Sequence, residues 1–173
     1  MNKIDLSNRS QVIELLAKNK VWTKKHLGQN LLVDRSVLNK IVEAADLHSD
    51  DLVIEVGAGI GTLTLELAKH AKKVVALDID QNLLAILRRN CYGLNNVEII
   101  NQNVLTSNIA EMIGDTAGFK VIANLPFYIT APTIRYFLEN DQRKTGRNCK
   151  GINKRCKQTW CCWTIGGRFR GEF

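Results

Sequence analysis

An amide, a rigid proline and an aromatic ring stand side by side in the segment Asn124, Leu125, Pro126 and Phe127. The segment follows an apolar run that predicts a buried strand, so it would lie at the carboxyl end of that strand, where open α/β sheets bind ligands. These groups suit methylation of the exocyclic amine of a nucleic-acid base. Such an amine is a poor nucleophile because its lone pair is delocalised into the ring.

Methylating this amine calls for two hydrogen-bond acceptors and a stacking surface. If the side-chain oxygen of Asn124 and the main-chain oxygen of Leu125 each accept one N–H, the lone pair is localised toward an incoming methyl group. The locked φ of Pro126 fixes the direction of the carbonyl, and the ring of Phe127 or Tyr128 can stack on the base. The alternative is that Pro126 only ends a strand and that both rings pack in the core.

A glycine-rich loop with the spacing G-x-G-x-G runs from Glu55 to Gly61. Without side chains, Gly57 and Gly59 let a ligand approach the backbone, and the helix that follows offers unpaired N–H groups. The spacing differs from the G-x-G-x-x-G of dinucleotide-binding loops, which disfavours a nicotinamide-dependent dehydrogenase. Glu55 would be buried and needs a partner. We favour a role in ordering the loop for a ligand over a structural salt bridge.

A carboxylate closes the second predicted strand. Asp78 lies 21 residues after Gly57, close to the offset of about 20 residues at which such folds place a carboxylate on a ribose. From this position it can accept both ribose hydroxyls. Asp80 is the competing candidate, but its place directly before a helical segment predicts a helix cap.

Strand-like and helix-like segments alternate from residue 51 onward and supply the frame for these groups. Apolar, β-branched runs predict strands over 51–57, 73–80, 96–100 and 119–126, and helical periodicity predicts helices over 8–19, 34–46, 62–71, 81–90, 107–113 and 130–140. This alternation predicts an α/β fold, with a parallel sheet flanked by helices and joined by right-handed crossovers.

The length of 173 residues and the 45% hydrophobic content indicate one globular domain with an extension. The net charge of +7 is confined to the end of the chain: residues 1–142 hold 15 basic and 16 acidic residues, whereas 143–173 hold nine basic residues and one acid. We find no secretory signal or membrane-length apolar run, so we expect a cytoplasmic protein with reduced thiols and no membrane partner. Surface arginines such as Arg88 and Arg89 are interpreted as solvated charges.

Four motifs between residues 24 and 140 resemble, in order, those of the rRNA adenine dimethyltransferases, and most closely those of the small-subunit (16S) branch. The resemblance implies a Rossmann-like methyltransferase fold that uses S-adenosyl-L-methionine to methylate two adjacent adenines of a 16S rRNA hairpin twice each. We further expect a monomer that acts on small-subunit precursors. The motifs are His26–Leu32, Glu55–Gly61, Asp78 with Asn103, and Asn124–Phe127.

The resemblance also implies roles for single residues around the cofactor. Asp78 would hold the ribose, where the family commonly has Glu. Asn103 stands where the family usually has an Asp that contacts the adenine amino group, so the lost charge predicts weaker cofactor binding. Asn30 and Leu32 would hold the methionine end of the cofactor, and Gly57 and Gly59 would lie beside it. Glu55 and Asn124 are also expected among the cofactor-binding residues.

The match to the family ends near residue 141, whereas family members continue through further strands and a helical domain. We therefore predict that residues 1–141 are a partial, four-stranded methyltransferase domain, and that 142–173 are a non-native, out-of-frame and disordered tail. The fourth strand would then be an open edge, and turnover weak or absent. The tail cysteines contain no C-x-x-C pair for zinc, but its basic residues, interleaved with Trp160 and Trp163, could bind RNA nonspecifically.

Two other functions stay open at this point. Methyltransferases that act on adenine of large-subunit rRNA share the chemistry, although Leu125 fits the small-subunit branch better. An inactive fragment that only binds cofactor or RNA is the second alternative.

Overall fold

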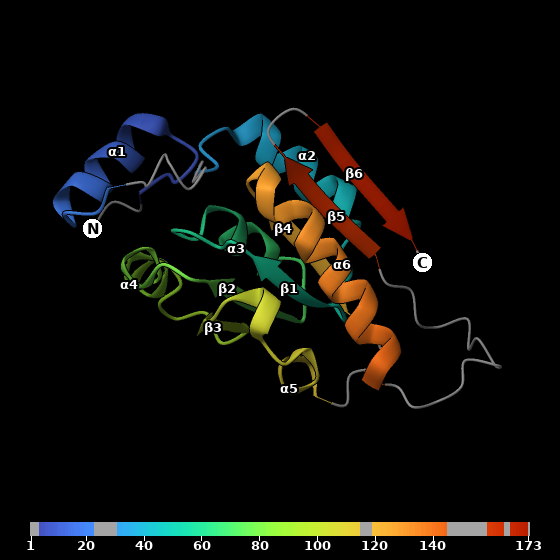
Figure 1. Cartoon of the computed structure of the whole chain (residues 1–173). Coiled ribbons are helices and arrows are strands. Elements are labelled where there is room, and N and C mark those ends of the chain that lie inside the picture. The colour runs from blue at the N-terminus through green and yellow to red at the C-terminus, as the bar shows by residue number, and fades with distance from the viewer. Residues whose placement is uncertain (1–3, 23–30, 115–118, 145–158, 165–166, 173) are drawn as a thin grey trace.

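Six strands of the described residues form one sheet in the order β3-β2-β1-β4-β5-β6 (Figure 1). The computed structural model describes residues 4–22, 31–114, 119–144, 159–164 and 167–172, with the backbone alone from residue 140 onward. Strands β1 to β4 pair in parallel, which confirms the predicted sheet. The strands are β1 (Leu52–Val56), β2 (Lys73–Asp78), β3 (Val97–Asn101), β4 (Lys120–Asn124), β5 (Thr159–Thr164) and β6 (Gly167–Glu172).

Helices cover both faces of this sheet. They are α1 (Arg9–Lys18), α2 (Arg35–Ala45), α3 (Thr62–Leu67), α4 (Gln81–Asn90), the 3₁₀ helix η2 (Val104–Thr106), α5 (Ile109–Ile113) and α6 (Phe127–Lys144). Helix α6 begins three residues earlier than predicted, directly after Pro126, whose carbonyl accepts a hydrogen bond from Ile129 N at 3.2 Å. Within the described ranges, no helix has both the length and the apolar character needed to cross a membrane.

The central strand β1 is buried on both faces, as its continuous apolar run predicts. Alternate side chains point to opposite layers. Ile54 and Val56 belong to the core cluster that includes Phe137 of α6, whereas Val53 belongs to the cluster that includes Ile41 of α2. The α/β sandwich therefore holds the end of β1, and the glycine loop that follows it, between two packed layers.

The chain reverses its direction of travel across the sheet at β1. It proceeds from β1 to β2 and β3 on one side and then returns to β4 on the other side. Ligands bind at such switch points, outside the carboxyl ends of the strands. The register pairs Val56 with Ala123, so the glycine loop after β1 and Asn124 at the end of β4 emerge next to each other.

Two strands are described within the segment that we expected to be disordered, at 159–164 and 167–172. Strand β5 pairs in parallel with β4, from Thr159 beside Lys120 to Trp163 beside Asn124, and β6 pairs antiparallel with β5. Strand β4 is therefore not an open edge, and this reason for weak turnover does not hold. Threonine and tryptophan favour strands, and the unpaired main-chain groups of an edge bind an added strand. The out-of-frame origin of the segment stays a prediction.

A lysine anchors the start of β4. Lys120 Nζ lies 2.8 Å from Asp51 Oδ2 and donates hydrogen bonds to the carbonyl oxygens of Ala45, at 3.3 Å, and Asp46. Those carbonyls close the carboxyl end of α2, where a cation is favourable. One side chain thus links α2, the residue before β1, and the strand that carries Asn124.

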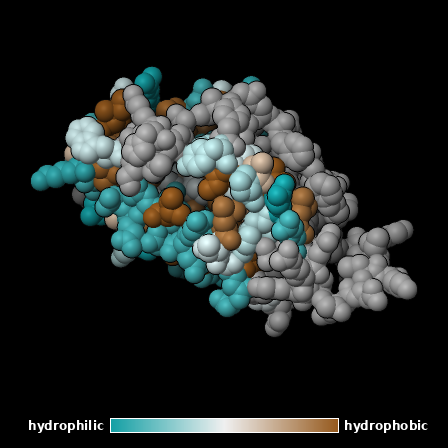
Figure 2. Space-filling view, in the orientation of Figure 1, coloured by the Kyte–Doolittle hydropathy of each residue, from teal (hydrophilic) through white to brown (hydrophobic). Residues whose placement is uncertain are grey.

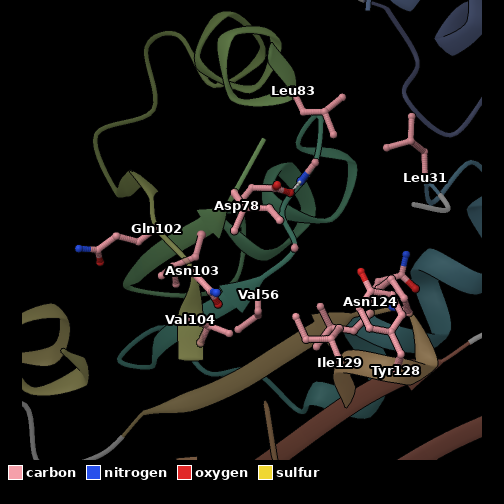
Figure 3. Close-up of a pocket in the computed structure, with 16 residues that line it drawn as sticks. Leu31, Val56, Asp78, Leu83, Gln102, Asn103, Val104, Asn124, Tyr128 and Ile129 are labelled. Carbon is pink, nitrogen blue, oxygen red and sulfur yellow. Dashed lines mark hydrogen bonds between the residues drawn. The ribbon is translucent and has the colours of Figure 1, made fainter. Parts of the chain in front are cut away.

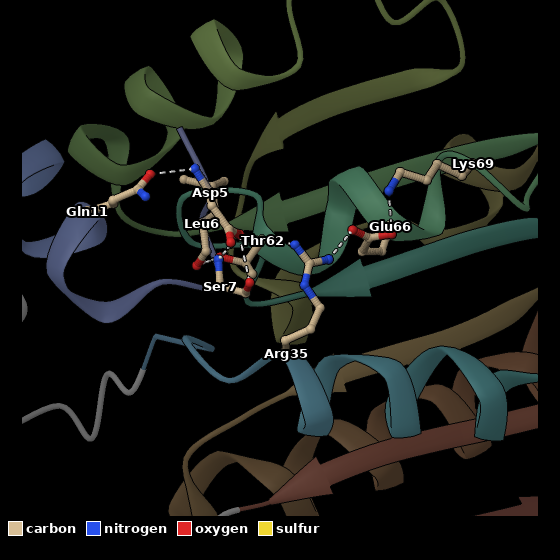
Figure 4. Close-up of polar contacts among 8 residues, drawn as sticks. All are labelled: Asp5, Leu6, Ser7, Gln11, Arg35, Thr62, Glu66 and Lys69. Carbon is tan, nitrogen blue, oxygen red and sulfur yellow. Dashed lines mark hydrogen bonds and ion pairs between the residues drawn. The ribbon is translucent and has the colours of Figure 1, made fainter. Parts of the chain in front are cut away.

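The N-terminal segment is attached beside the glycine loop by a polar network (Figure 4). The Arg35 guanidinium bonds Asp5 Oδ1 at 3.0 Å and Glu66 Oε1 at 2.7 Å. The Leu6 side chain is buried, and its carbonyl accepts a hydrogen bond from Thr62 Oγ1 at 3.4 Å. Residues 4–7 therefore lie against the beginning of α3.

We predict that the close packing of α3 on α4 depends on Gly61. This residue has φ +94°, and a Cβ there would lie 2.4 Å from Leu87 Cδ1, a buried side chain. Gly61→Ala should lower the free energy of unfolding by about 2–4 kcal/mol, because it adds overpacking to backbone strain. Gly93 also has positive φ, +88°, but open space around it, so Gly93→Ala should cost only about 1–2 kcal/mol. Urea denaturation measures both, and equal losses would contradict the packing argument.

Candidate functional site

A pocket of about 150 Å³ opens at the carboxyl ends of β1, β2 and β4 (Figure 3). Its walls come from segments far apart in the sequence, which the parallel sheet brings to one edge. The lining consists of Leu31, Val56, Gly57, Gly59, Leu77, Asp78, Ile79, Leu83, Gln102, Asn103, Val104, Asn124, Leu125, Pro126, Tyr128 and Ile129. Most of these side chains are apolar, with a few polar groups among them, which is the usual composition of a small-molecule site.

The glycine loop forms the floor between β1 and β4. The amides of Gly57 and Ala58 both donate to Leu77 O, at 2.9 and 3.0 Å, which turns the chain sharply after β1. Gly57 has φ +78°, and a Cβ there would lie 3.1 Å from Leu125 Cδ2 and 3.6 Å from Asn124 O. A side chain at this position would therefore occupy the space between the loop and the end of β4.

Asp78 is held rigidly at the end of β2. Its Oδ2 accepts from Gly59 N at 2.8 Å and its Oδ1 accepts from Asp80 N at 2.9 Å. Burial raises the pKa of this carboxyl above its usual range, and the two backbone hydrogen bonds oppose that shift. Each carboxylate oxygen retains acceptor capacity, so Asp78 can still accept hydroxyl groups from a ligand in the pocket.

Asp80 has the capping role that its position predicts. It is the N-cap of α4, and its Oδ1 accepts from Asn82 N at 3.0 Å. It does not line the pocket. The geometry therefore separates the two carboxylates, with Asp78 facing the pocket and Asp80 committed to the helix.

Glu55 is buried under the glycine loop. Its Oε2 accepts a hydrogen bond from Thr64 Oγ1 of α3 at 2.6 Å, and in the described part of the chain it forms no salt bridge. Burial raises the pKa of Glu55 to about 8, with a further contribution from the negative charge of Asp78. Glu55 also lines a smaller cavity of about 30 Å³ next to the main pocket, together with Leu32, Gly57 and other residues of the loop.

Asn103 lines the pocket, but its side-chain oxygen already accepts a hydrogen bond within the protein. Its Oδ1 accepts from Leu105 N at 3.0 Å and caps η2. The amide nitrogen is not used by this cap, so the side chain can still offer a donor toward the pocket.

The segment Asn124–Pro126 forms the wall opposite Asp78. Leu125 is buried, and Pro126 O accepts from Thr130 Oγ1 at 3.0 Å as α6 begins. Tyr128 is 64% exposed and lines the pocket, so its ring is not a core residue as the alternative reading required. Phe127 begins α6, but its side chain lies outside the described side chains.

Seven of the eleven predicted site residues line the main pocket, and two more, Leu32 and Glu55, line the smaller cavity beside it. Phe127 follows Pro126 directly in the chain. The remaining one, Asn30, lies outside the described residues. Sequence reasoning missed several apolar lining residues, among them Ile79, Leu83 and Ile129. Ile79 could have been noticed in the sequence, because it is an apolar residue between two acids at the end of a predicted strand. In the structure its side chain is 59% exposed.

The arrangement fits a nucleoside-containing cofactor. Asp78 offers acceptors for ribose hydroxyls, and apolar side chains such as Ile79 and Val104 offer surfaces for a flat ring. The smaller cavity at Glu55 and Leu32 adjoins the glycine loop and leaves room for a polar chain attached to the nucleoside. Asn124 lines both cavities.

A family model described as Ribosomal RNA adenine dimethylase matches residues 21–150. The chain belongs to this family. The family uses S-adenosylmethionine, so the resemblance and the expected cofactor are confirmed, whereas the assignment of single residues to parts of the cofactor stays a prediction.

Individual relatives agree with the family match. The chain is 46% identical over 142 residues to the ribosomal RNA small subunit methyltransferase A of Alkaliphilus metalliredigens, covering 80% of this chain and 49% of the relative. It is 43% identical over 139 residues to that of Clostridioides difficile, covering 79% and 48%. The chain therefore spans about half the length of these relatives.

Solved structures show the same fold. The crystal structure of the 23S rRNA methyltransferase ErmE aligns with a TM-score of 0.57 and 28% identity, covering 75% of this chain and 46% of that chain. A dimethyladenosine transferase from Plasmodium falciparum aligns with a TM-score of 0.55 and 26% identity, covering 75% and 42%. The Rossmann-like methyltransferase fold is confirmed.

We predict that Glu55 makes folding stability depend on pH. The pKa of about 8 keeps Glu55 protonated in the folded protein up to about pH 8, whereas the unfolded chain loses this proton near the ordinary glutamate pKa of 4.5. The free energy of unfolding should therefore fall as pH rises between these values, by an amount on the order of a few kcal/mol. Glu55→Gln has no proton to lose and should flatten this dependence in urea denaturation.

The matched control for this measurement is the exposed Glu43 of α2. Glu43→Gln should retain the pH slope of the wild type. An unchanged slope in Glu55→Gln would show that Glu55 ionises alike in the folded and unfolded states.

Proposed function

We propose that this chain is an S-adenosylmethionine-dependent rRNA adenine dimethyltransferase that acts on two adjacent adenines of 16S rRNA during small-subunit biogenesis. One observation carries the proposal: a single pocket is lined by the glycine loop, Asp78, Asn124 and Leu125. We further propose that the protein acts in the cytoplasm as a monomer.

S-adenosylmethionine supplies an electrophilic methyl group when bound. The protein's own groups bind and orient: Asp78 accepts the ribose hydroxyls, and the loop at Gly57 accommodates the methionine end. Asn124 Oδ1 and Leu125 O then accept the two N–H groups of the target adenine. These acceptors hold the amine so that its lone pair faces the methyl group, and the released proton passes to solvent without a dedicated base.

The proposed chemistry also assigns a role to the exposed aromatic ring at the pocket. Tyr128 stands on the first turn of α6, beside Pro126 and opposite Asp78. A base that leaves its helix loses stacking, and an aromatic side chain replaces part of it. Tyr128 or Phe127 is proposed to supply this stacking surface.

Methylation of adenine in large-subunit rRNA is a second candidate, supported by the structural similarity to a 23S rRNA methyltransferase. The identity of that protein to this chain is 28%, against 46% for a small-subunit relative, which favours the small subunit. Methyl transfer to unmethylated small and large subunits, measured side by side, separates the two candidates.

We predict that Asp78 contributes a charge-assisted contact to cofactor binding. Asp78→Asn should weaken S-adenosylmethionine binding about tenfold in calorimetry, because hydrogen bonds to an ionised acceptor are about twice as strong as neutral ones. The control is Asp80→Asn, since asparagine is an equally good N-cap and Asp80 does not line the pocket. Equal affinities of the two variants would refute the ribose assignment.

We predict that Asn124 acts mainly on methyl transfer. Asn124→Ala should reduce the transfer rate to unmethylated small subunits by about a hundredfold or more, because a preorganised polar group at the reacting centre is lost. Asn39, an exposed residue of α2, provides the control Asn39→Ala. Transfer at the wild-type rate by the Asn124 variant would exclude the proposed role of its amide oxygen.

A further inference from the structure

We propose that the adjoining ends of α1 and α4 form a second contact surface for the rRNA substrate, outside the pocket for the target adenine. This inference rests on the proposed function. The surface, named here the α1/α4 surface, combines four cations with two aromatic rings. Its residues are Lys18, Lys20, Trp22, Arg88, Arg89 and Tyr92.

A hydrogen bond and a shared apolar cluster hold the two helix ends together. Arg89 Nη1 donates to Asn19 Oδ1 at 2.6 Å, and Val21 packs against the cluster that contains Ile86 of α4. Trp22 follows Asn19 by three residues and Tyr92 follows Arg89 by three, so the backbone of each aromatic residue lies within about 10 Å of the backbone of one of the two bonded residues. The hydrogen bond therefore brings together groups that come from separate parts of the sequence.

Among the described residues, the cations of this region differ from Lys69 and Lys73 in having no carboxylate partner. Lys69 pairs with Glu66 at 2.6 Å and Lys73 with Glu98 at 2.7 Å, so their charges are largely compensated. Among the residues that the structure describes, the four cations of the α1/α4 surface form no ion pair. Helix α4 itself contains no acidic residue between Gln81 and Asn90.

Uncompensated cations favour a polyanion. Each phosphate that a lysine or arginine neutralises releases condensed counterions, and this release drives binding to nucleic acids. Figure 2 shows hydrophilic side chains gathered over α1 and α4 on this face. The charge of the region is thus complementary to an RNA backbone.

The two aromatic rings favour RNA over other polyanions. Trp22 is 78% exposed and Tyr92 is 92% exposed, so neither ring contributes much to the core. Exposed rings beside arginines and lysines are the combination on which unpaired bases stack. A protein surface rich in carboxylates would pair with the cations but would not stack on the aromatic rings.

The α1/α4 surface lies close enough to the pocket to act on the same substrate molecule. Leu83, in the first turn of α4, lines the pocket. Arg88 and Arg89 stand in the last turn of the same helix, about 8–9 Å further along its axis. One folded RNA segment can therefore place an adenine in the pocket and a neighbouring strand on this surface.

The test measures binding of the full chain to small ribosomal subunits with unmethylated rRNA, over a range of salt concentrations. Lys18→Gln with Arg88→Gln should weaken binding about tenfold at low salt and reduce the slope of log K against log salt by about 1.5. The matched control is Lys40→Gln with Lys72→Gln, two exposed lysines elsewhere on the surface, which removes the same charge and should change binding less than twofold. Trp22→Ala with Tyr92→Ala should weaken binding at least about fivefold.

Several results would overturn the α1/α4 surface as an RNA contact. Equal losses in the charge variant and its control would mean that net charge alone matters. The surface would also be excluded if the aromatic variant bound the ribosomal particles as tightly as the wild type. The same holds if the variants lost binding only to vesicles of anionic phospholipid and not to the particles. Calorimetry with S-adenosylmethionine shows whether each variant is folded at the pocket.

The same measurements separate this inference from the proposed function. If the wild-type chain methylates the particles while the variants bind them normally, only the α1/α4 surface is refuted. If the wild type neither binds nor methylates the particles, the proposed function fails and the inference fails with it.

Discussion

The close approach of the glycine loop to the end of β4 is the constraint on which the site depends. Gly57 has φ +78°, and a Cβ there would stand 3.1 Å from Leu125 Cδ2, so a side chain would be strained and would crowd the space between the two segments. The parallel register of β1 and β4 sets this distance, because Val56 lies beside Ala123. The proposed cofactor binding and base recognition both depend on this junction of the two strand ends.

Four neighbouring carboxylates and amides take separate roles because their environments differ. Glu55 is buried beneath the loop, and this burial favours its neutral form although its side chain accepts a hydrogen bond from Thr64. Asp78 is fixed by two backbone amides but still borders the pocket. Asp80 and Asn103 each use a side-chain oxygen to cap a helix, α4 and η2 respectively. Chemical type alone does not distinguish these groups; burial and hydrogen-bond partners do.

Sequence reasoning identified seven of the residues that line this pocket because their signals are local. A buried β-branched run such as Leu52–Val56 has few alternatives to a central parallel strand, and a glycine triplet directly after it has few alternatives to a close turn. The position of Asp80 before α4 identified it as a cap, which left Asp78 for the pocket. Strands β5 and β6 were not predicted. Their formation depends on the pairing of β5 with the edge of β4, which is a non-local interaction and leaves no local signal in a basic, cysteine-containing segment.

The sequence by itself determined the order of strands β1 to β4 and of the main helices up to α6, the family motifs and the residue types at the carboxyl ends of these strands. These features follow from local periodicity and spacing. Only the tertiary structure decided that Tyr128 faces the pocket, that Glu55 bonds Thr64 rather than a cation, and that the ends of α1 and α4 meet through Asn19 and Arg89. These facts depend on how distant segments pack against each other, and packing between segments leaves no periodic signal along the chain.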